Sequence, residues 1–424
     1  MADLTTTFAG VTSPNPFWLA SAPPTNTGGQ VMRAFEAGWG GAVWKTLGKP
    51  IENVTSRFGA MDYAGKKIAG FNNIELITDR SIETNLKEML ETKKRFPKHA
   101  LIASLMVETK EEWKTIIKQV EDVGSDAIEL NFGCPHGMCE RGMGSAVGQE
   151  PRVLEEITGW GKTFAKIPVI VKLTPNITDV TVPAAAARRA GADAVSLINT
   201  IKSVVGVDLD NFVAYPTVNG KATNGGYCGP AVKPIALNMV GQIARKNGNA
   251  LLISGIGGIS NWRDAVEFMV MGSGNVQVCT AVMHYGYRIV EDMIQGMSDY
   301  MDSKKFTSTS QFIGRAVPNF CDWEQLDRQY SLLAKINEEH CIGCNLCVVA
   351  CDDGAHQCIK VNSEFRADGF TRRAPVIKED ECVGCNLCQL VCPSPGAITM
   401  TEIPYRPAYG SVTDVAKNGP RHGH

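Results

Sequence analysis

Eight of the 14 cysteines form two copies of one pattern near the C-terminal end of the sequence. The copies read CIGCNLCVVAC (341–351) and CVGCNLCQLVCP (382–393), and both have the spacing C-x2-C-x2-C-x3-C. Such a loop directs three thiolates at a cubane of iron and sulfur, while the fourth cysteine ligates the neighbouring cluster. The spacing therefore predicts two 4Fe–4S clusters, which carry single electrons. The predicted ligands are Cys341, Cys344, Cys347 and Cys392 for one cluster and Cys382, Cys385, Cys388 and Cys351 for the other.

The alternative for this pattern is a pair of zinc sites, because C-x2-C pairs also bind zinc. A zinc site uses two such pairs per ion, whereas here a third cysteine follows after two more residues in both copies. The spacing thus favours clusters. Cys358 lies outside the repeat, and we interpret it as a packed side chain.

Small and polar residues gather at the ends of short apolar runs in the first part of the chain. In a barrel of parallel strands these ends meet at one face, where active sites lie. The pairs Gly257–Gly258 and Cys279–Thr280 would follow strands seven and eight, the usual phosphate site. No G-x-G-x-x-G follows any run, so the residues favour FMN over a dinucleotide. The candidates at these ends are Ala20, Ser21, Lys45, Thr46, Asn131, Lys172, Asn199, Thr200, Gly257, Gly258, Cys279 and Thr280.

Two lysines, Lys45 and Lys172, stand among these candidates. A cation near the N1–C2 edge of a flavin favours the reduced, anionic ring. At an effective dielectric of ~20, a charge at about 4 Å is worth roughly 4 kcal/mol before desolvation is subtracted. We assign this role to Lys172. The alternative for each lysine is that it merely reaches solvent.

The segment 131–149, NFGCPHGMCERGMGSAVGQ, contains five glycines, as expected of a mobile loop that covers an active site. Cys134 lies at its root. A thiol with a pKa near ~8.5 is mostly protonated at neutral pH, so this residue can donate a proton. His136 could bind substrate or tune the thiol, or it could be only a loop histidine.

The elements that must position these residues alternate between β-rich apolar runs and segments of helical period. The helical segments include Lys110–Gly124, whose apolar residues share one face. About eight such units predict a closed (β/α)8 barrel; the alternative is an open doubly wound sheet. The candidate strands are Pro16–Ala22, Gly41–Thr46, Ala100–Met106, Ala127–Phe132, Pro168–Thr174, Ala194–Thr200, Leu251–Gly257 and Asn275–Ala281.

The domain boundaries follow from these patterns. The expected order is a catalytic barrel over 1–303, a connector over 304–335, a small α+β ferredoxin-like domain over 336–403 and a flexible tail over 404–424. The net charge is −2 with no long run of one sign, so we expect no nucleic-acid or membrane partner. The sequence shows no signal peptide and no apolar stretch of ~20 residues, which predicts a cytoplasmic protein.

Several segments resemble the dihydropyrimidine dehydrogenase family. Its active-site loop is similar to CPHGMCERGMG (134–144), and the order of barrel and twin-cluster module agrees over about residues 4–403. The closest form is the bacterial two-subunit, NAD-dependent one. The resemblance implies reversible reduction of uracil and thymine to their 5,6-dihydro forms. Further similar segments are GFNNIELI (70–77), VKLTPN (171–176), INT (198–200), GGYCGPAVKPIAL (225–237) and VQVCTAV (276–282).

The resemblance also implies roles for single residues. Cys134 would protonate pyrimidine C5 while FMN N5 delivers hydride to C6. The groups that would bind the pyrimidine edge are Asn73, Glu75, Asn131, Asn199 and Thr200, and the FMN contacts would be Ser21, Lys45, Lys172, Gly229, Gly257, Gly258, Cys279 and Thr280. Two positions depart from the family: Gly133 stands where a serine is usual, and Cys139 replaces a glycine and could compete as the acid.

The large animal enzymes of this family also contain FAD and NADPH domains, which this chain lacks. We therefore expect electrons from NAD(P)H to arrive through a separate flavin subunit, and the family implies a homodimer within a heterotetramer. Two rival functions remain. One is a dihydroorotate dehydrogenase, in which the loop cysteine acts as a base; the other is a non-catalytic electron-transfer subunit.

Overall fold

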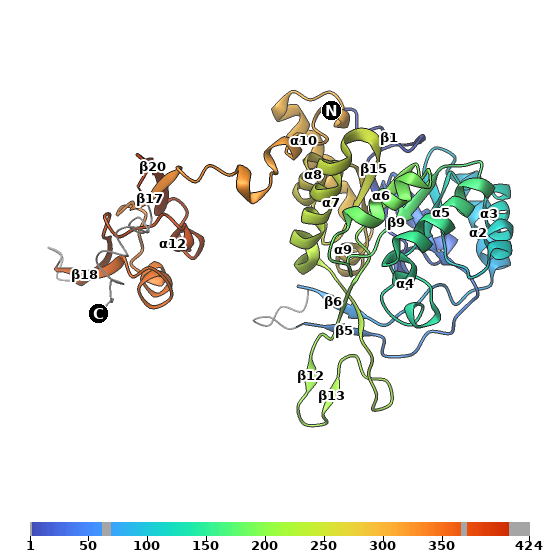
Figure 1. The fold of residues 1–424 in the computed structure, drawn as a ribbon, viewed down its shortest axis with the longest axis horizontal. Helices are drawn as coiled ribbons and strands as arrows, with labels where there is room; N and C mark the ends of the chain where they lie inside the picture. Colours follow the sequence, from blue (N-terminus) through green and yellow to red (C-terminus); the bar gives the residue numbers. More distant parts are fainter. Residues whose placement is uncertain (1, 62–68, 366–370, 407–424) are drawn as a thin grey trace. The chain divides into compact units, whose positions relative to one another are not determined.

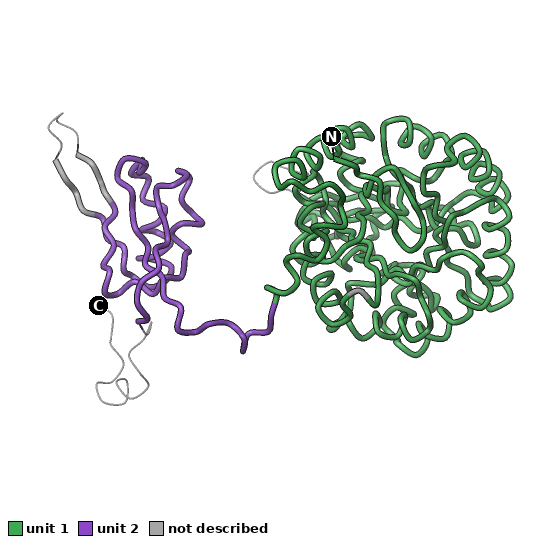
Figure 2. The backbone as a smooth tube through the Cα atoms, turned by 90° about the horizontal axis from the view of Figure 1, so that it is seen from above, with its two compact units in different colours: residues 1–320 green, residues 321–424 purple. Residues whose placement is uncertain are grey.

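The computed structural model describes residues 2–61, 69–365 and 371–406. The chain divides into two compact units, residues 1–320 and 321–424, which Figure 2 colours separately. The first unit includes the start of the segment expected as a connector, since Phe312 is buried in the barrel core and the Gly314 N–H donates to the Met269 carbonyl at 2.9 Å. Residues 407–424 of the expected tail lie outside the described residues.

The first unit is a closed barrel of parallel strands surrounded by helices (Figure 1). Around the ring the strands follow the order β10-β15-β16-β3-β4-β7-β8-β9, so each lies beside its neighbours in sequence. This order confirms the predicted (β/α)8 barrel, and the alternative of an open doubly wound sheet is wrong. The strands are β3 (Phe17–Leu19), β4 (Gly41–Leu47), β7 (Ala100–Leu105), β8 (Ala127–Asn131), β9 (Val169–Lys172), β10 (Ala194–Leu197), β15 (Leu252–Ile256) and β16 (Ser273–Val278).

Helices cover the outside of the barrel, and α3 shows why the sequence forms them. Thr109 accepts a hydrogen bond from the Glu112 N–H at 3.2 Å, and the Glu112 carboxylate accepts one from the Thr109 N–H at 2.9 Å. This reciprocal cap starts the helix. Its buried face is Trp113, Ile116, Ile117 and Val120, as the helical period predicts. The main helices are α1 (Gly28–Ala37), α2 (Ile82–Arg95), α3 (Lys110–Asp122), α5 (Pro151–Phe164), α6 (Thr181–Arg189), α7 (Lys233–Asn247), α8 (Trp262–Val270) and α10 (Ile289–Lys304), with the short α4 (Ser145–Gly148) and α9 (Thr280–Tyr285).

Insertions between the barrel strands build a small antiparallel sheet with the order β11-β14-β6-β5. Asn73 of β6 pairs with Gly226 of β14, which joins two segments that are far apart in sequence. Figure 1 shows a hairpin of β12 (Val207–Asp208) and β13 (Val213–Ala214) that projects from the barrel. The sheet strands are β5 (Phe58–Ala60), β6 (Phe71–Asn73), β11 (Ile201–Ser203) and β14 (Gly225–Cys228); a further hairpin is formed by β1 (Thr6–Phe8) and β2 (Val11–Ser13).

The second unit contains two antiparallel strand pairs and the two cysteine loops. β17 (Ser331–Ile336) pairs with β20 (Ile398–Ile403), and β18 (Ile359–Phe365) pairs with β19 (Thr371–Ile377). Each loop leads into a short helix, α11 (Leu346–Val348) or α12 (Leu387–Leu390), after an asparagine with a φ of 60° or 68°. The two loops therefore enter their helices with the same left-handed backbone conformation at the asparagine. Among the described residues, no helix has the length and apolar character needed to cross a membrane.

Candidate active site

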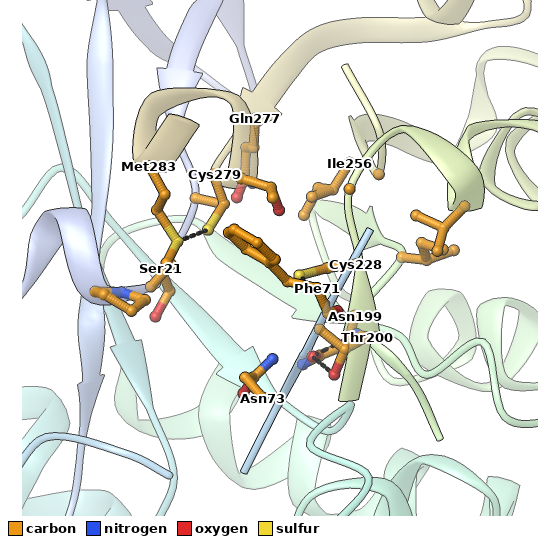
Figure 3. A pocket seen from close by; sticks show the side chains of 18 of the residues that line it. Ser21, Phe71, Asn73, Asn199, Thr200, Cys228, Ile256, Gln277, Cys279 and Met283 are labelled. Carbon is orange, nitrogen blue, oxygen red and sulfur yellow. Dashed lines mark hydrogen bonds between the residues drawn. The ribbon is translucent and has the colours of Figure 1, made fainter. Parts of the chain in front are cut away.

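A cavity of about 1180 Å³, its open mouth included, lies at the carboxyl ends of the barrel strands. This volume has room for a cofactor and a substrate, since small-molecule sites measure roughly 300–1,000 Å³. Figure 3 shows side chains from several elements lining it, among them Ser21, Asn73 and Asn199. Every barrel residue predicted for the site lines this cavity: Ala20, Ser21, Lys45, Thr46, Asn73, Glu75, Asn131, Cys134, His136, Lys172, Asn199, Thr200, Gly229, Gly257, Gly258, Cys279 and Thr280.

One wall of the cavity is a cradle of glycines. Gly229, Gly257 and Gly258 have φ values of 101°, 126° and 73°, a region that glycine adopts without strain. A Cβ on Gly258 would lie 2.9 Å from the Gly229 carbonyl oxygen, so a side chain would fill the space between the two loops. Gly257 and Gly258 follow β15, the seventh barrel strand, and Gly229 follows β14. Exposed backbone of this kind beside the end of the seventh strand fits a phosphate group.

Beneath the cavity, Lys172 of β9 and Glu129 of β8 form a buried ion pair. The Lys172 Nζ lies 3.5 Å from the Glu129 Oε1, and both residues are at most 4% exposed. The Glu129 Oε2 accepts hydrogen bonds from Ser196 at 2.7 Å and from the Gln277 Nε2 at 3.3 Å. These contacts hold the ammonium group in place, so the alternative that Lys172 merely reaches solvent is wrong.

Gln277 gives a second test of whether a flavin fits. It is fully buried and lines the cavity, yet among the described residues its Oε1 has no hydrogen-bond partner. A buried acceptor of this kind normally has a partner. An N–H group on the edge of a flavin ring could donate to this oxygen, so the unpaired acceptor fits FMN. Sequence reasoning missed Gln277 and Glu129, although both are polar residues inside apolar runs, and that signal could have found them.

Lys45 is also buried, and it pairs with a carboxylate. Its Nζ forms an ion pair with Glu75, whose other oxygen lies 3.2 Å from the Arg57 Nε. The side chains of Lys45 and Glu75 are only 5% and 7% exposed. The solvent-reaching alternative is therefore wrong for Lys45 as well. Sequence reasoning did not find Arg57, which lies just before β5 in the inserted sheet.

Three of the predicted pyrimidine contacts, Asn131, Asn199 and Thr200, are linked by hydrogen bonds. The Asn131 Nδ2 donates to the Thr46 Oγ1 at 2.9 Å, and the Asn199 Nδ2 donates to the Asn131 Oδ1 at 3.0 Å. The Thr200 N–H donates to the Asn199 Oδ1 at 2.8 Å, and the Asn73 Nδ2 donates to the Gly226 carbonyl at 2.9 Å. These bonds fix the amide orientations and leave further donors and acceptors on the amides for a ligand.

The Cys134 loop lies over this network with its thiol buried. The Cys134 Sγ donates to the His136 carbonyl at 3.4 Å, and the side chain is 8% exposed. Burial raises the pKa of Cys134 to about 11, and the neighbouring Cys139 adds to this rise. The thiol is therefore protonated at neutral pH. Methionines 138 and 143 pack the loop against Ile77 and Met106.

His136 connects the same loop to the segment that follows β6. Its Nε2 lies 3.2 Å from the Glu75 carbonyl, and the residue is 4% exposed, so it is not a surface loop histidine. Burial lowers the pKa of His136, which keeps the ring neutral at pH 7. Next to the thiol, a Cβ on Gly133 would lie 2.4 Å from the Asn199 Cβ. The glycine at this position therefore lets the loop pass Asn199.

The second unit contains two cavities lined by cysteines. One, of about 330 Å³, is lined by Cys341, Cys344, Cys347 and Cys392, and the other, of about 340 Å³, by Cys351, Cys382, Cys385, Cys388 and Cys358. The structure thus brings together each set of four that the spacing predicts, with the fourth cysteine crossing to the other loop. Among the described residues, no three His, Cys, Asp or Glu side chains are arranged to hold a single metal ion. The Cys358 side chain is buried, as expected, but it also lines a cluster cavity.

Comparison with known proteins places both units in families. The family model for dihydroorotate dehydrogenases matches residues 3–301, and the family model for 4Fe-4S dicluster domains matches residues 334–400. The NAD-dependent dihydropyrimidine dehydrogenase subunit PreA of Escherichia coli K12 is 42% identical over 366 residues, which is 86% of this chain and 89% of that protein. The chloroplastic dihydropyrimidine dehydrogenase (NADP(+)) of Arabidopsis thaliana is 42% identical over 331 residues, 75% of this chain and 78% of that one. The catalytic subunit of dihydroorotate dehydrogenase B (NAD(+)) from Pyrococcus horikoshii is 35% identical over 315 residues, 73% of this chain and 96% of that one.

Proposed function

Since the chain belongs to the dihydropyrimidine dehydrogenase family, with a barrel of the dihydroorotate dehydrogenase type and a 4Fe-4S dicluster domain, we propose that it reversibly reduces uracil and thymine to their 5,6-dihydro forms. The observation that carries this proposal is the buried, protonated thiol of Cys134, which lines one cavity with the linked amides of Asn131 and Asn199. The cofactors are FMN in the barrel and two 4Fe–4S clusters in the second unit.

The chain's own groups fit the FMN. Gly229, Gly257 and Gly258 would hold its phosphate, and Lys172 and Gln277 would contact its ring. When bound, FMN supplies the hydride for C6 of the pyrimidine. The Lys172 ammonium, held by Glu129, would stabilise negative charge on a bound flavin ring, because opposite charges attract strongly at short range in a buried site.

Cys134 supplies the proton. Its Sγ carries a proton at neutral pH and gives it to C5 during reduction; in the reverse reaction the thiolate takes that proton back. The loop that carries the thiol covers the site, and the contact of neutral His136 with the Glu75 carbonyl holds it there. Covering the site excludes water from the reacting atoms.

The amides select the ring. Uracil and thymine present alternating carbonyl and N–H groups, and asparagine side chains can pair with both. Such groups come from three separate segments: Asn73 from β6, Asn131 from β8, and Asn199 with Thr200 from the connection between β10 and β11. Both lysines of the cavity are already paired with buried carboxylates, Lys45 with Glu75 and Lys172 with Glu129.

The test compares the oxidation of dihydrouracil, dihydrothymine and dihydroorotate by the flavin-loaded chain with an artificial electron acceptor. We expect turnover of the first two and little of the third. Faster turnover of dihydroorotate would contradict the proposal and favour the rival activity. Absence of turnover with all three, in protein that retains FMN, would favour a non-catalytic electron-transfer subunit instead.

We further propose that the electrons come from NAD(P)H through a separate flavin subunit, in a heterotetramer that contains a homodimer of this chain. The Escherichia coli relative is itself named as a subunit. The clusters, when bound, carry single electrons. Co-purification with iron and flavin analysis tests the partner directly. Full-rate oxidation of NADH with uracil by this chain alone would contradict it.

A further inference from the structure

The two cluster cavities differ by one thiol. Each is lined by the four cysteines of one predicted ligand set, but the cavity of Cys351, Cys382, Cys385 and Cys388 is also lined by Cys358. The other cavity has Ala397 in its lining. Cys358 is 3% exposed and Ala397 is 1% exposed, so both positions belong to the interior of the unit.

Cys358 and Ala397 occupy equivalent positions in the internal repeat. The Cys358 carbonyl accepts a hydrogen bond from the Lys378 N–H at 2.8 Å, and the Ala397 carbonyl accepts one from the Asn337 N–H at 2.8 Å. Lys378 and Asn337 each stand four residues before the first cysteine of a loop. The residues after Cys358 and Ala397 begin β18 and β20. One cavity therefore has a thiol where the other has only a methyl group.

The extra thiol contacts a ligand of its own cluster. The Sγ atoms of Cys358 and Cys351 are 3.4 Å apart, within hydrogen-bonding distance for sulfur. A cysteine that ligates iron is deprotonated and has no proton to donate. In the loaded protein, Cys358 must then be the donor and Cys351 the acceptor.

We propose that the Cys358 S–H donates a hydrogen bond to the Cys351 ligand and thereby raises the reduction potential of that cluster above the value it would have with alanine. Reduction adds negative charge to the cluster and its sulfurs. A hydrogen bond to a charged acceptor is stronger than one to a neutral acceptor, so the donor stabilises the reduced form more. Hydrogen bonds to sulfur are among the features that set cluster potentials. The cavity of Ala397 lacks this donor.

The proposal rests on the dicluster domain and does not depend on the substrate of the barrel. Its test uses the full chain, purified without oxygen with flavin and clusters bound. The midpoint potentials of the two clusters are followed by low-temperature EPR during a redox titration, with iron and sulfide analysis of each variant. The variants are Cys358→Ala, Cys358→Ser and Ala397→Cys. Because pyrimidine turnover is not measured, the outcome is independent of the proposed reaction.

We expect Cys358→Ala to keep the full iron content and to lower the potential of one cluster while leaving the other unchanged. Cys358→Ser should retain most of the original potential, since its hydroxyl can still donate. Ala397→Cys introduces the thiol at the equivalent position and should raise the potential of the other cluster.

Unchanged potentials in Cys358→Ala would overturn the proposal. Equal shifts in the alanine and serine variants would do the same, because they would point to cavity size. Loss of one cluster's iron would show Cys358 to be a ligand and would also overturn it.

Discussion

Among single residues, Cys134 is suited to donate a proton because burial raises the pKa of its thiol. Replacing Cys134 with alanine removes the proton donor and leaves the glycine cradle and Lys172 intact. We expect the rate of pyrimidine reduction to fall by about 10²–10⁴-fold, the usual contribution of a general acid. FMN should remain bound. Steady-state turnover with an artificial donor, together with the flavin absorbance of the purified variant, measures both effects.

The matched control is Cys139→Ala, which changes the other thiol of the same loop. Cys139 is not buried in the described structure and does not line the cavity. We therefore expect an almost unchanged rate. A rate in Cys134→Ala that equals the original would remove this residue from the mechanism, and a large loss in the control instead would assign the proton to Cys139.

The raised pKa of Cys134 also predicts a pH profile. Reduction of uracil needs the protonated thiol, which is present below the pKa of about 11. We expect kcat/KM for reduction to stay level from about pH 7 to about pH 10 and to fall above that range. Oxidation of dihydrouracil needs the thiolate, so its rate should rise about tenfold per pH unit below the pKa. A reduction profile that falls through a pKa near ~8.5 would show that the thiol is in contact with water.

The pair of Lys172 and Glu129 predicts an effect on stability. Lys172→Gln leaves the Glu129 carboxylate buried without its cation, and breaking such a pair costs roughly 3–5 kcal/mol. The double variant Lys172→Gln and Glu129→Gln removes both charges and should recover most of that loss. Urea unfolding of the two variants and the parent protein measures the difference. Equal losses in the single and double variants would mean that the charge of Glu129 does not matter.

The site residues at the ends of apolar runs could be predicted from the sequence, because the strands of a parallel barrel all end at one face regardless of loop conformation. Sequence reasoning missed groups whose position depends on contacts between distant segments. Arg57 reaches Glu75 only through the inserted sheet, and Gln277 reaches Glu129 across the barrel interior. The solvent-reaching alternative for the lysines was wrong because the carboxylates that pair with them could not be placed from spacing.

At the level of whole elements, the glycine cradle predicts a loss of cofactor binding. Gly258→Ala forces a side chain into a backbone with φ of 73° and brings Cβ within 2.8 Å of the Lys233 backbone nitrogen. We expect markedly weaker FMN binding, measured by flavin fluorescence during titration of the apoprotein. The control is Gly29→Ala in α1, where a Cβ meets no atom within 4 Å. Equal FMN affinity in the two variants would show that the cradle does not hold the phosphate.

The elements that could be predicted are those with a clear period. The barrel strands and α3 follow from continuous apolar runs and from a 3.6-residue repeat. The strands of the inserted sheet could not be found in this way, because they have only three or four residues and no alternating pattern. These strands place Asn73 and Cys228 in the lining of the cavity. Part of the site is therefore formed by strands that no sequence pattern predicts.

For the molecule as a whole, the boundary of the first unit gives a test by truncation. A chain of residues 1–320 should fold, bind FMN and contain no iron. A chain that ends at residue 303 lacks Phe312, which is fully buried in the barrel core. Removing a buried phenylalanine costs roughly 3–5 kcal/mol, so the shorter chain should unfold at lower urea concentration. Equal stability of the two fragments would place the barrel boundary where the sequence predicted it.

The partner subunit, the heterotetramer and the cytoplasmic location stay predictions at this scale. None of them leaves a pattern within one chain that would fix it. The exchange of the fourth cysteine between the two loops could be predicted, because the spacing C-x2-C-x2-C-x3-C is typical of it. The contact of Cys358 with Cys351 could not be predicted, because it depends on how the two halves of the repeat pack against each other.

Gly133 has a consequence for protein engineering. A designer who introduces the serine that the family resemblance suggests at this position would treat Gly133→Ser as a safe change. Here the new side chain would collide with Asn199, a predicted contact for the pyrimidine. Gly133→Ser would therefore displace Asn199 and disturb the candidate active site, unless position 199 were redesigned at the same time.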